Sequence, residues 1–140
     1  MVVVTRDNYG RTRARHFTVQ GVKARHRRKA ERIAPGDRVC WYVVGGGGGF
    51  VATATVTSPA FEDSRPIWRS TGRQDPYPWR FTIARGVVRD ADDAIPAASL
   101  VDRLAFTRRW PRAHWPLAFQ GNLHEIGRRD FTVIERALSS

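Results

Sequence analysis

The chain has 140 residues, 41% of them hydrophobic and 11% aromatic, and its 24 lysines and arginines against 13 aspartates and glutamates give a formal charge of +11. This length predicts a single domain over residues 1–140 and excludes two large domains, and the apolar fraction excludes global disorder. The single Cys40 excludes an internal disulfide and a multi-cysteine zinc site. No apolar stretch approaches the roughly 20 residues that span a bilayer, so we expect a cytoplasmic protein without a membrane contact.

The N-terminal half carries short strand and helix patterns. In chain order we expect a strand, a helix capped by Asp7 and Asn8, a break, a second helix, and two strands joined as a hairpin. Their expected positions are Val2–Thr5, about Asp7–His16, Val19–Val22, Arg25–Ile33, Arg38–Val44 and Phe50–Thr57. The glycines of Gly45–Gly49 predict a mobile tip for the hairpin.

The C-terminal half opens on a polar connection from Ser58 to Pro78, which is too long for an ordinary turn; long connections in small domains are often functional. A strand, a candidate helix, an irregular segment whose Trp110 and Trp115 should pack inward, and a closing helix are expected after it. Their positions are Trp79–Val88, Pro96–Leu104, Arg109–Phe119 and Asp130–Leu138. The patterns together predict an α+β fold, a small mixed sheet or barrel flanked by helices.

Positive charge is concentrated near the N-terminus. Residues 6–38 contain eleven lysines and arginines and three acids, which accounts for +8 of the +11. A second, milder cluster consists of Arg103, Arg108, Arg109, Arg112, Arg128 and Arg129. If the fold brings the two clusters together, they form one positive face that attracts phosphate backbones, so we expect a nucleic-acid partner.

Motifs for other chemistries are missing from the sequence. The glycine run lacks the Lys-Ser/Thr of a phosphate loop and leads into a strand instead of a helix. The four histidines are scattered without a ligand-like spacing, and no Gly-x-Ser-x-Gly occurs. We therefore expect no catalytic residue, no metal and no cofactor.

Seven segments carry a resemblance that covers nearly the whole chain. They are TRDN (Thr5–Asn8), VQGVKARH (Val19–His26), APGDRVCWYV (Ala34–Val43), FEDSRPIW (Phe61–Trp68), YPWRF (Tyr77–Phe81), LVDRLAFTRRW (Leu100–Trp110) and RRDFTVIERAL (Arg128–Leu138). In this order and spacing they resemble the EVE domain, a member of the PUA-like superfamily related to the YTH readers of methylated RNA. The resemblance implies a PUA-like curved β-sheet or barrel of about five or six strands flanked by helices.

The resemblance also implies a pocket that takes a single base out of a strand. An asparagine just after the first strand, which matches Asn8, would bind the base edge, and Gly21 falls where the relatives offer a backbone carbonyl to an exocyclic amine. Trp68 matches an aromatic wall, and Tyr77 falls near the position of another. Gln20 departs from the family, which usually has a tryptophan wall at this position.

The departure at Gln20 has an energetic consequence. Stacking a base on one aromatic side chain is worth about 1–3 kcal/mol, and extruding a base from a duplex costs a few kcal/mol. One wall therefore predicts weak binding, a preference for single-stranded or already extruded bases, or a cage rebuilt with Trp41 or Tyr77. Purely structural roles stay open: Asn8 as a helix cap, Trp68 as a cover of the barrel end, and Tyr77 as loop packing.

The leading hypothesis is a non-catalytic domain that binds RNA or modified DNA, with RNA slightly favoured, and recognises one possibly modified base. Phosphate contacts are expected at Arg6, Arg25, Arg27, Arg28 and Lys29. One alternative is a binder of a free nucleotide-like small molecule. The other is an RNA- or nucleotide-processing enzyme of the same superfamily, which needs an acid or histidine such as Asp63 or His114 in the pocket. The oligomeric state stays open.

Overall fold

The computed structural model describes residues 1–46, 48–70 and 76–140, so Gly47 of the expected mobile hairpin tip lies outside the described residues. The strands are β1 (Val2–Val4), β2 (Val19–Val22), β3 (Arg38–Val43), β4 (Gly49–Val56), β5 (Phe61–Glu62), β6 (Trp79–Val88) and β7 (Ile95–Pro96). The α-helices are α1 (Arg6–Ala14), α2 (Arg27–Glu31) and α3 (Arg128–Leu138). Short 3-10 helices occupy Ala24–His26, Ala91–Asp93, Ala97–Ser99, Val101–Arg103, Phe106–Arg109 and Arg112–Phe119.

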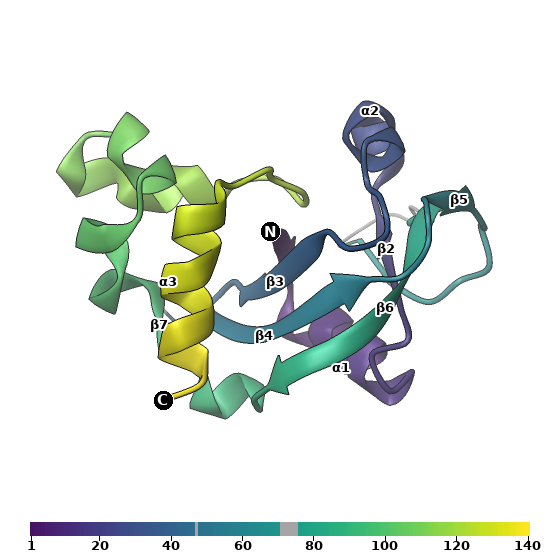
Figure 1. Ribbon diagram of the computed structural model, residues 1–140, viewed down its shortest axis with the longest axis horizontal. Helices are drawn as coiled ribbons and strands as arrows, with labels where there is room; N and C mark the ends of the chain where they lie inside the picture. The colour runs from purple at the N-terminus through teal and green to yellow at the C-terminus, as the bar shows by residue number, and fades with distance from the viewer. Residues whose placement is uncertain (47, 71–75) are drawn as a thin grey trace.

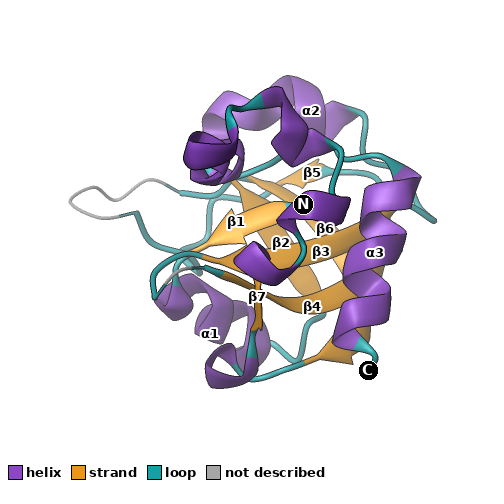
Figure 2. Ribbon diagram, turned by 90° about the vertical axis from the view of Figure 1, so that its left-hand side faces the viewer, coloured by secondary structure: helices purple, strands orange, loops and turns teal. Residues whose placement is uncertain are grey.

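The strands form one curved mixed sheet. Its order is β1-β3-β4-β6-β2, with β5 added to β6 and β7 added to β4. β1 runs parallel to β3, whereas the other pairs are antiparallel. The helices lie around this sheet, with α1 below it, α2 above it and α3 across one face (Figures 1 and 2). The expected α+β, PUA-like arrangement is therefore confirmed, with seven strands of which β5 and β7 have two residues each.

The central strand β3 is buried on both faces. Side chains alternate across a strand, so Trp41 packs on one face and Tyr42 on the other. The Trp41 ring lies 5.6 Å from that of Phe17, edge to face, and Tyr9 completes this cluster from α1. On the opposite face, the Tyr42 ring stacks 4.1 Å from that of Phe119 beneath the C-terminal helices. The two cores fix the sheet between α1 and α3.

Three expected elements differ from the structure. α1 begins at Arg6, and its cap is Thr5, whose Oγ1 accepts a hydrogen bond from the Asn8 backbone N–H at 3.1 Å, so the predicted cap by Asp7 and Asn8 is wrong. Val19–Val22 is an edge strand as well as a break. Pro96–Leu104 forms two 3-10 turns instead of an α-helix because its backbone bonds join residues three apart.

The Trp/Pro segment packs only in part. Trp115 lies edge to face with Phe119 at 5.8 Å, as expected. Trp110 is 41% exposed, so the expectation that it packs inward is wrong. Within residues 1–46, 48–70 and 76–140, no helix combines the length and apolar character needed to cross a membrane, and no group of three acidic, histidine or cysteine side chains is placed to hold a metal ion.

β1 has a second partner besides β3. The chain from residue 122 to residue 124 runs antiparallel to residues 1–3, with a bridge between Val2 and Leu123. The Val3 backbone N–H donates to the Asn122 carbonyl at 2.9 Å, and the Asn122 side-chain amide donates to the Val3 carbonyl at 3.0 Å. The Asn122 Oδ1 also accepts from the Lys23 backbone N–H at 3.0 Å. One buried asparagine thus ties β1 to the chain that leads into α2.

Candidate nucleic-acid interface

The fold brings together all five residues expected in the base pocket. Asn8 lies on α1, Gln20 and Gly21 on β2, and Trp68 and Tyr77 on the long connection between β5 and β6. Two further residues, Thr12 of α1 and Arg80 of β6, contact them. The seven residues are here called the Trp68 cluster: Asn8, Thr12, Gln20, Gly21, Trp68, Tyr77 and Arg80.

The Trp68 indole fills the space beside Gly21. Its side chain is buried, and its Nε1–H donates to Thr12 Oγ1 at 2.8 Å. A Cβ placed on Gly21 would lie 2.5 Å from the indole Cζ3 and 2.9 Å from the Tyr77 carbonyl oxygen. Only glycine allows this close approach of backbone and ring. In this conformation the indole occupies the surface of Gly21 on which a base was expected.

Gln20 is a buried hydrogen-bond hub, which corrects the view of it as a pocket wall. Its Oε1 accepts from Thr12 Oγ1 at 2.7 Å and from Trp41 Nε1 at 2.9 Å. Its Nε2 donates to the Gly21 carbonyl at 2.7 Å. The carbonyl expected to meet a base amine is therefore already paired. Because Trp41 is fully buried and bound to Gln20, the expectation that Trp41 replaces the lost wall is wrong.

Asn8 holds the backbone that follows Trp68. Its Oδ1 accepts from the Arg69 backbone N–H at 2.9 Å, and its Nδ2 donates to the Arg69 carbonyl at 2.7 Å. The Nδ2 also donates to the Tyr77 hydroxyl at 3.2 Å. The amide therefore presents donor and acceptor in the pattern that would bind a base edge, but it presents them to the protein's own backbone.

Arg80 is a buried cation on the far side of Trp68. Its guanidinium lies 5.2 Å from the Trp68 ring centre and donates to the carbonyls of Tyr77, at 3.0 Å, and Arg65. Burial lowers the pKa of Arg80. Asp63 lies 3.5 Å from it, and hydrogen bonds from Arg65, with the charges of both arginines, lower the pKa of Asp63 to about 2. Asp63 is therefore an ion-pair partner at the rim of the cluster.

Sequence reasoning missed Thr12, Arg80 and Lys23. Thr12 stands four positions after Asn8, so both side chains emerge on the same face of α1. Arg80 is a cation between two aromatic residues within a strand, a position where a charge needs a partner. Lys23 directly follows β2, and its Nζ lies 6.0 Å from the centre of the Tyr77 ring.

Four of the five expected phosphate contacts lie together. Arg25 belongs to the 3-10 turn Ala24–His26, and the next three belong to α2. Arg27 lies 5.5 Å from the Trp79 ring centre and pairs with Glu31 at 2.9 Å. Arg28 is exposed, whereas Lys29 donates to the Leu123 carbonyl at 2.9 Å. The exposed basic surface of Arg25, Arg27 and Arg28 is called the α2 basic face below.

Arg6 does not join this face. It starts α1, on the opposite side of the sheet from α2 (Figures 1 and 2), and forms an ion pair with Asp92. Arg6 therefore stays a separate predicted phosphate contact, two residues before Asn8 of the Trp68 cluster and apart from the α2 basic face.

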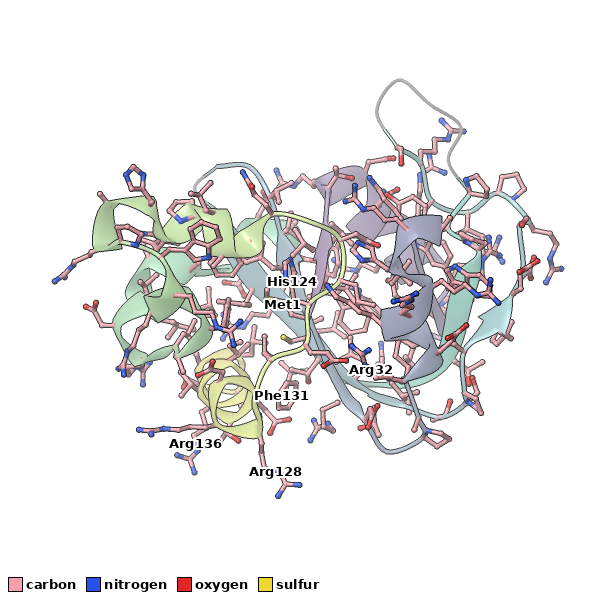
Figure 3. All side chains as sticks on the ribbon, turned by 90° about the horizontal axis from the view of Figure 1, so that it is seen from above. Met1, Arg32, His124, Arg128, Phe131 and Arg136 are labelled. Carbon is pink, nitrogen blue, oxygen red and sulfur yellow. The ribbon has the colours of Figure 1, made fainter. Side chains whose placement is uncertain are left out.

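The two basic segments of the sequence meet at a cavity between α2 and α3. The cavity has a volume of about 430 Å³, and Lys29, Arg32 and Arg38 of the N-terminal segment line it together with Arg128 of the C-terminal one. Figure 3 shows Arg32 and the extended segment of His124 between the two helices, with Arg128 extending outward from α3. Asp37 and Glu125 line it too, and Arg32 pairs with Glu125, so the opening gathers four cations, from both basic segments, against two acids.

The pH dependence of stability should reveal His26 beside this opening. Partial burial and the neighbouring cations, Lys29 first among them, lower the pKa of His26 from 6.5 to about 4. The unfolded chain therefore takes up a proton at a higher pH than the folded chain does. We expect the free energy of unfolding to fall, by on the order of 1 kcal/mol after solvent screening, as the pH drops from about 6.5 to about 4.

Urea unfolding at several pH values checks this expectation. His26→Gln should flatten the slope in that window, while His114→Gln, a substitution on an exposed turn, should leave it as in the wild type. Identical slopes for wild type and both variants would show that His26 does not contribute.

Comparison with known proteins relates nearly the whole chain to one family. A family model described as the EVE domain matches residues 2–136. No curated protein matches the sequence. Among solved structures, the YTH domain of the Zygosaccharomyces rouxii MRB1 protein in complex with N6-methyladenosine RNA has 18% identity and a TM-score of 0.63, with 98% of this chain and 84% of that chain covered.

Two further structures share the fold at lower identity. A hypothetical protein from Leishmania major has 13% identity and a TM-score of 0.58, with 98% of this chain and 92% of that chain covered. The YTH domain-containing protein mmi1, in complex with RNA, has 13% identity and a TM-score of 0.51, with 99% and 78% covered. At these identities the likeness establishes the fold.

Proposed function

The chain belongs to the EVE domain family, and from that premise we propose that it is a non-catalytic nucleic-acid-binding domain that recognises a single base, with RNA slightly favoured over DNA. The observation that carries the proposal is the meeting of the two basic segments around one opening beside the α2 basic face. Clustered arginines on one face are the electrostatic signature of phosphate binding. Two solved structures with this fold contain RNA, which supports the choice of polymer.

Base recognition in this proposal takes place at the Trp68 cluster after Trp68 leaves Gly21. The base would then stack on the indole, and the Asn8 amide and the Gly21 carbonyl would exchange their internal partners for the base edge. Each exchange gives up a hydrogen bond already made, so we expect weak affinity and a preference for bases that need no extrusion. An added methyl group on the base would gain about 0.8 kcal/mol if its carbon is buried.

The same geometry supports a role without catalysis. A general base needs a pKa near the working pH, and Asp63, with a pKa of about 2, is too weak a base for that role. His114 lies exposed in the 3-10 helix Arg112–Phe119, and no contact joins it to the described residues of the Trp68 cluster. A binding role explains the cluster's polar groups without assigning proton transfer to any of them.

Replacement of Arg25, Arg27 and Arg28 by glutamine together should lower affinity for every oligonucleotide sequence about equally. It should also reduce the slope of log affinity against log salt by about 2–3, because each lost phosphate contact removes nearly one released counterion. Fluorescence anisotropy with single-stranded RNA and DNA, plain and base-modified, at two salt concentrations measures both effects.

The matched control replaces three exposed arginines outside the α2 basic face: Arg15, Arg85 and Arg136. It removes the same net charge. An equal loss of affinity in both variants would therefore show that overall charge, and not the α2 basic face, attracts the nucleic acid. Salt-independent binding of a neutral nucleoside, with no binding of oligonucleotides, would contradict the proposed function and favour a free small-molecule ligand.

A further inference from the structure

A second cavity adjoins the one between α2 and α3. It has a volume of about 690 Å³ and lies under the C-terminal 3-10 helices. Both cavities are lined by the same three residues, His124, Glu125 and Ile126, so they adjoin along this extended segment. The residues that line the two cavities reach from α2, across this segment, to the start of α3. This surface path is called the 124–126 track below.

One end of the 124–126 track carries an exposed indole. Trp110 lines the second cavity, is 41% exposed, and makes no ring contact within the described part of the chain. By contrast, Trp115, five residues on, is packed against Phe119. Arg109 and Arg129 line the same cavity. An exposed indole between two cations offers a flat surface for a base and charge for its phosphates.

Two cations of the track occupy positions that do not stabilise the fold. Arg128 and Arg129 occupy the first turn of α3, where the helix dipole disfavours positive charge. Neither makes an ion pair with any residue that the structure describes, unlike Arg32, which pairs with Glu125 at 2.6 Å. Asp130, the acid of that turn, is occupied with the backbone N–H groups of Ala105 and Phe106, at 2.8 and 3.0 Å. Unpaired cations at an unfavourable place indicate an anionic partner.

The shape of the track indicates the kind of anion. The lining of the first cavity combines apolar side chains, Phe81 and Leu123 among them, with four cations and two acids. The second repeats the combination, with Trp110 as its aromatic surface. A double helix would hide its bases from both, whereas a single strand presents alternating bases and phosphates.

We propose that a single-stranded segment of nucleic acid lies along the 124–126 track, with one base stacked on Trp110 and neighbouring phosphates held by Arg128 and Arg129. The proposal rests on the proposed function and deepens it, since it gives the strand a path outside the Trp68 cluster. It makes affinity depend on the length of the strand as well as on the identity of the recognised base.

The test uses anisotropy with labelled, unmodified uridine oligoribonucleotides of about three and about ten nucleotides. Trp110→Ala should weaken binding of the longer strand about tenfold, and Trp110→Phe should retain most of the affinity because it keeps an aromatic face. Trp110 is exposed, so both variants should unfold at the wild-type temperature, which a thermal melt verifies.

A pair of charge variants on one helix tests the phosphate contacts. Arg128→Gln should reduce the salt slope for the longer strand by about 1, whereas Arg136→Gln should leave it unchanged. Arg136 is the matched control because it lies about two turns further along α3 and lines neither cavity.

The outcomes separate this proposal from the proposed function. If the wild type binds no oligonucleotide, plain or base-modified, the proposed function fails; if it binds base-modified strands but neither uridine strand, the track alone fails. If the wild type binds but Trp110→Ala has the same affinity at both strand lengths, the track alone is overturned. The same holds if Arg128→Gln and Arg136→Gln have equal salt slopes. Binding of uridine monophosphate as tight as that of the longer strand would also overturn it, because the cavities would then be a small-molecule site.

Discussion

Trp68→Ala is expected to lower the free energy of unfolding by about 3–5 kcal/mol and to abolish the difference in affinity between plain and base-modified oligonucleotides. The stability loss follows from burial: the indole packs against Gly21, lies beside the Arg80 guanidinium and donates to Thr12. The loss of discrimination follows from the removal of the stacking surface. Urea unfolding and anisotropy with matched oligonucleotide pairs measure the two effects.

Two further variants keep this prediction decisive. Trp68→Phe retains a ring beside Gly21 but removes the Nε1–H donor to Thr12, so it should fold and keep part of the discrimination. Trp115→Ala removes a partly buried indole from the other core, so it should lose stability without losing discrimination. Discrimination that survives both Trp68 substitutions would make Trp68 a structural cover of the barrel end.

Thr12→Val should change stability and base affinity in opposite directions. The hydroxyl accepts from Trp68 and donates to Gln20, so its removal leaves a buried indole N–H unpaired and should cost about 1–3 kcal/mol of unfolding free energy. The same loss weakens the closed position of Trp68. If the base replaces the indole at Gly21, the open state becomes more populated and the affinity for base-modified oligonucleotides should rise up to about fivefold.

Thr107→Val is the matched control. Thr107 is also buried, and its hydroxyl donates only to the Val101 and Leu104 carbonyls, at 3.0 and 2.9 Å. It should lose stability with no change in affinity. If Thr12→Val binds with unchanged or lower affinity, the base does not enter by displacing Trp68.

Local signals predicted most of the fold. The β-branched runs at Val2–Val4 and Arg38–Val43 and the apolar stripe of α3 are strong local patterns, and the structure confirms them. The cap of α1 was misplaced because Thr5, Asp7 and Asn8 are all good capping types, and only the start of the helix decides among them. The exposure of Trp110 depends on tertiary packing that no local pattern encodes.

The family resemblance predicted which residues lie together but not which hydrogen bonds they form with one another. It placed Asn8, Gly21, Trp68 and Tyr77 in one cluster, and the structure places them there. It could not show that Gln20, in place of a tryptophan, turns inward to bind Thr12 and Trp41. That outcome depends on two partners distant in sequence, and it leaves Trp68 free to close onto the backbone.

The pairing of β1 on both edges has a consequence for folding during translation. Val2–Val4 is synthesised well before Asn122 and Leu123, the residues that complete its outer edge. Until those residues emerge, the nascent chain carries an unpaired apolar strand edge, the kind of surface that chaperones recognise and that aggregates. This edge can therefore be completed only once Asn122 and Leu123 have been synthesised, and truncation before Asn122 leaves it open.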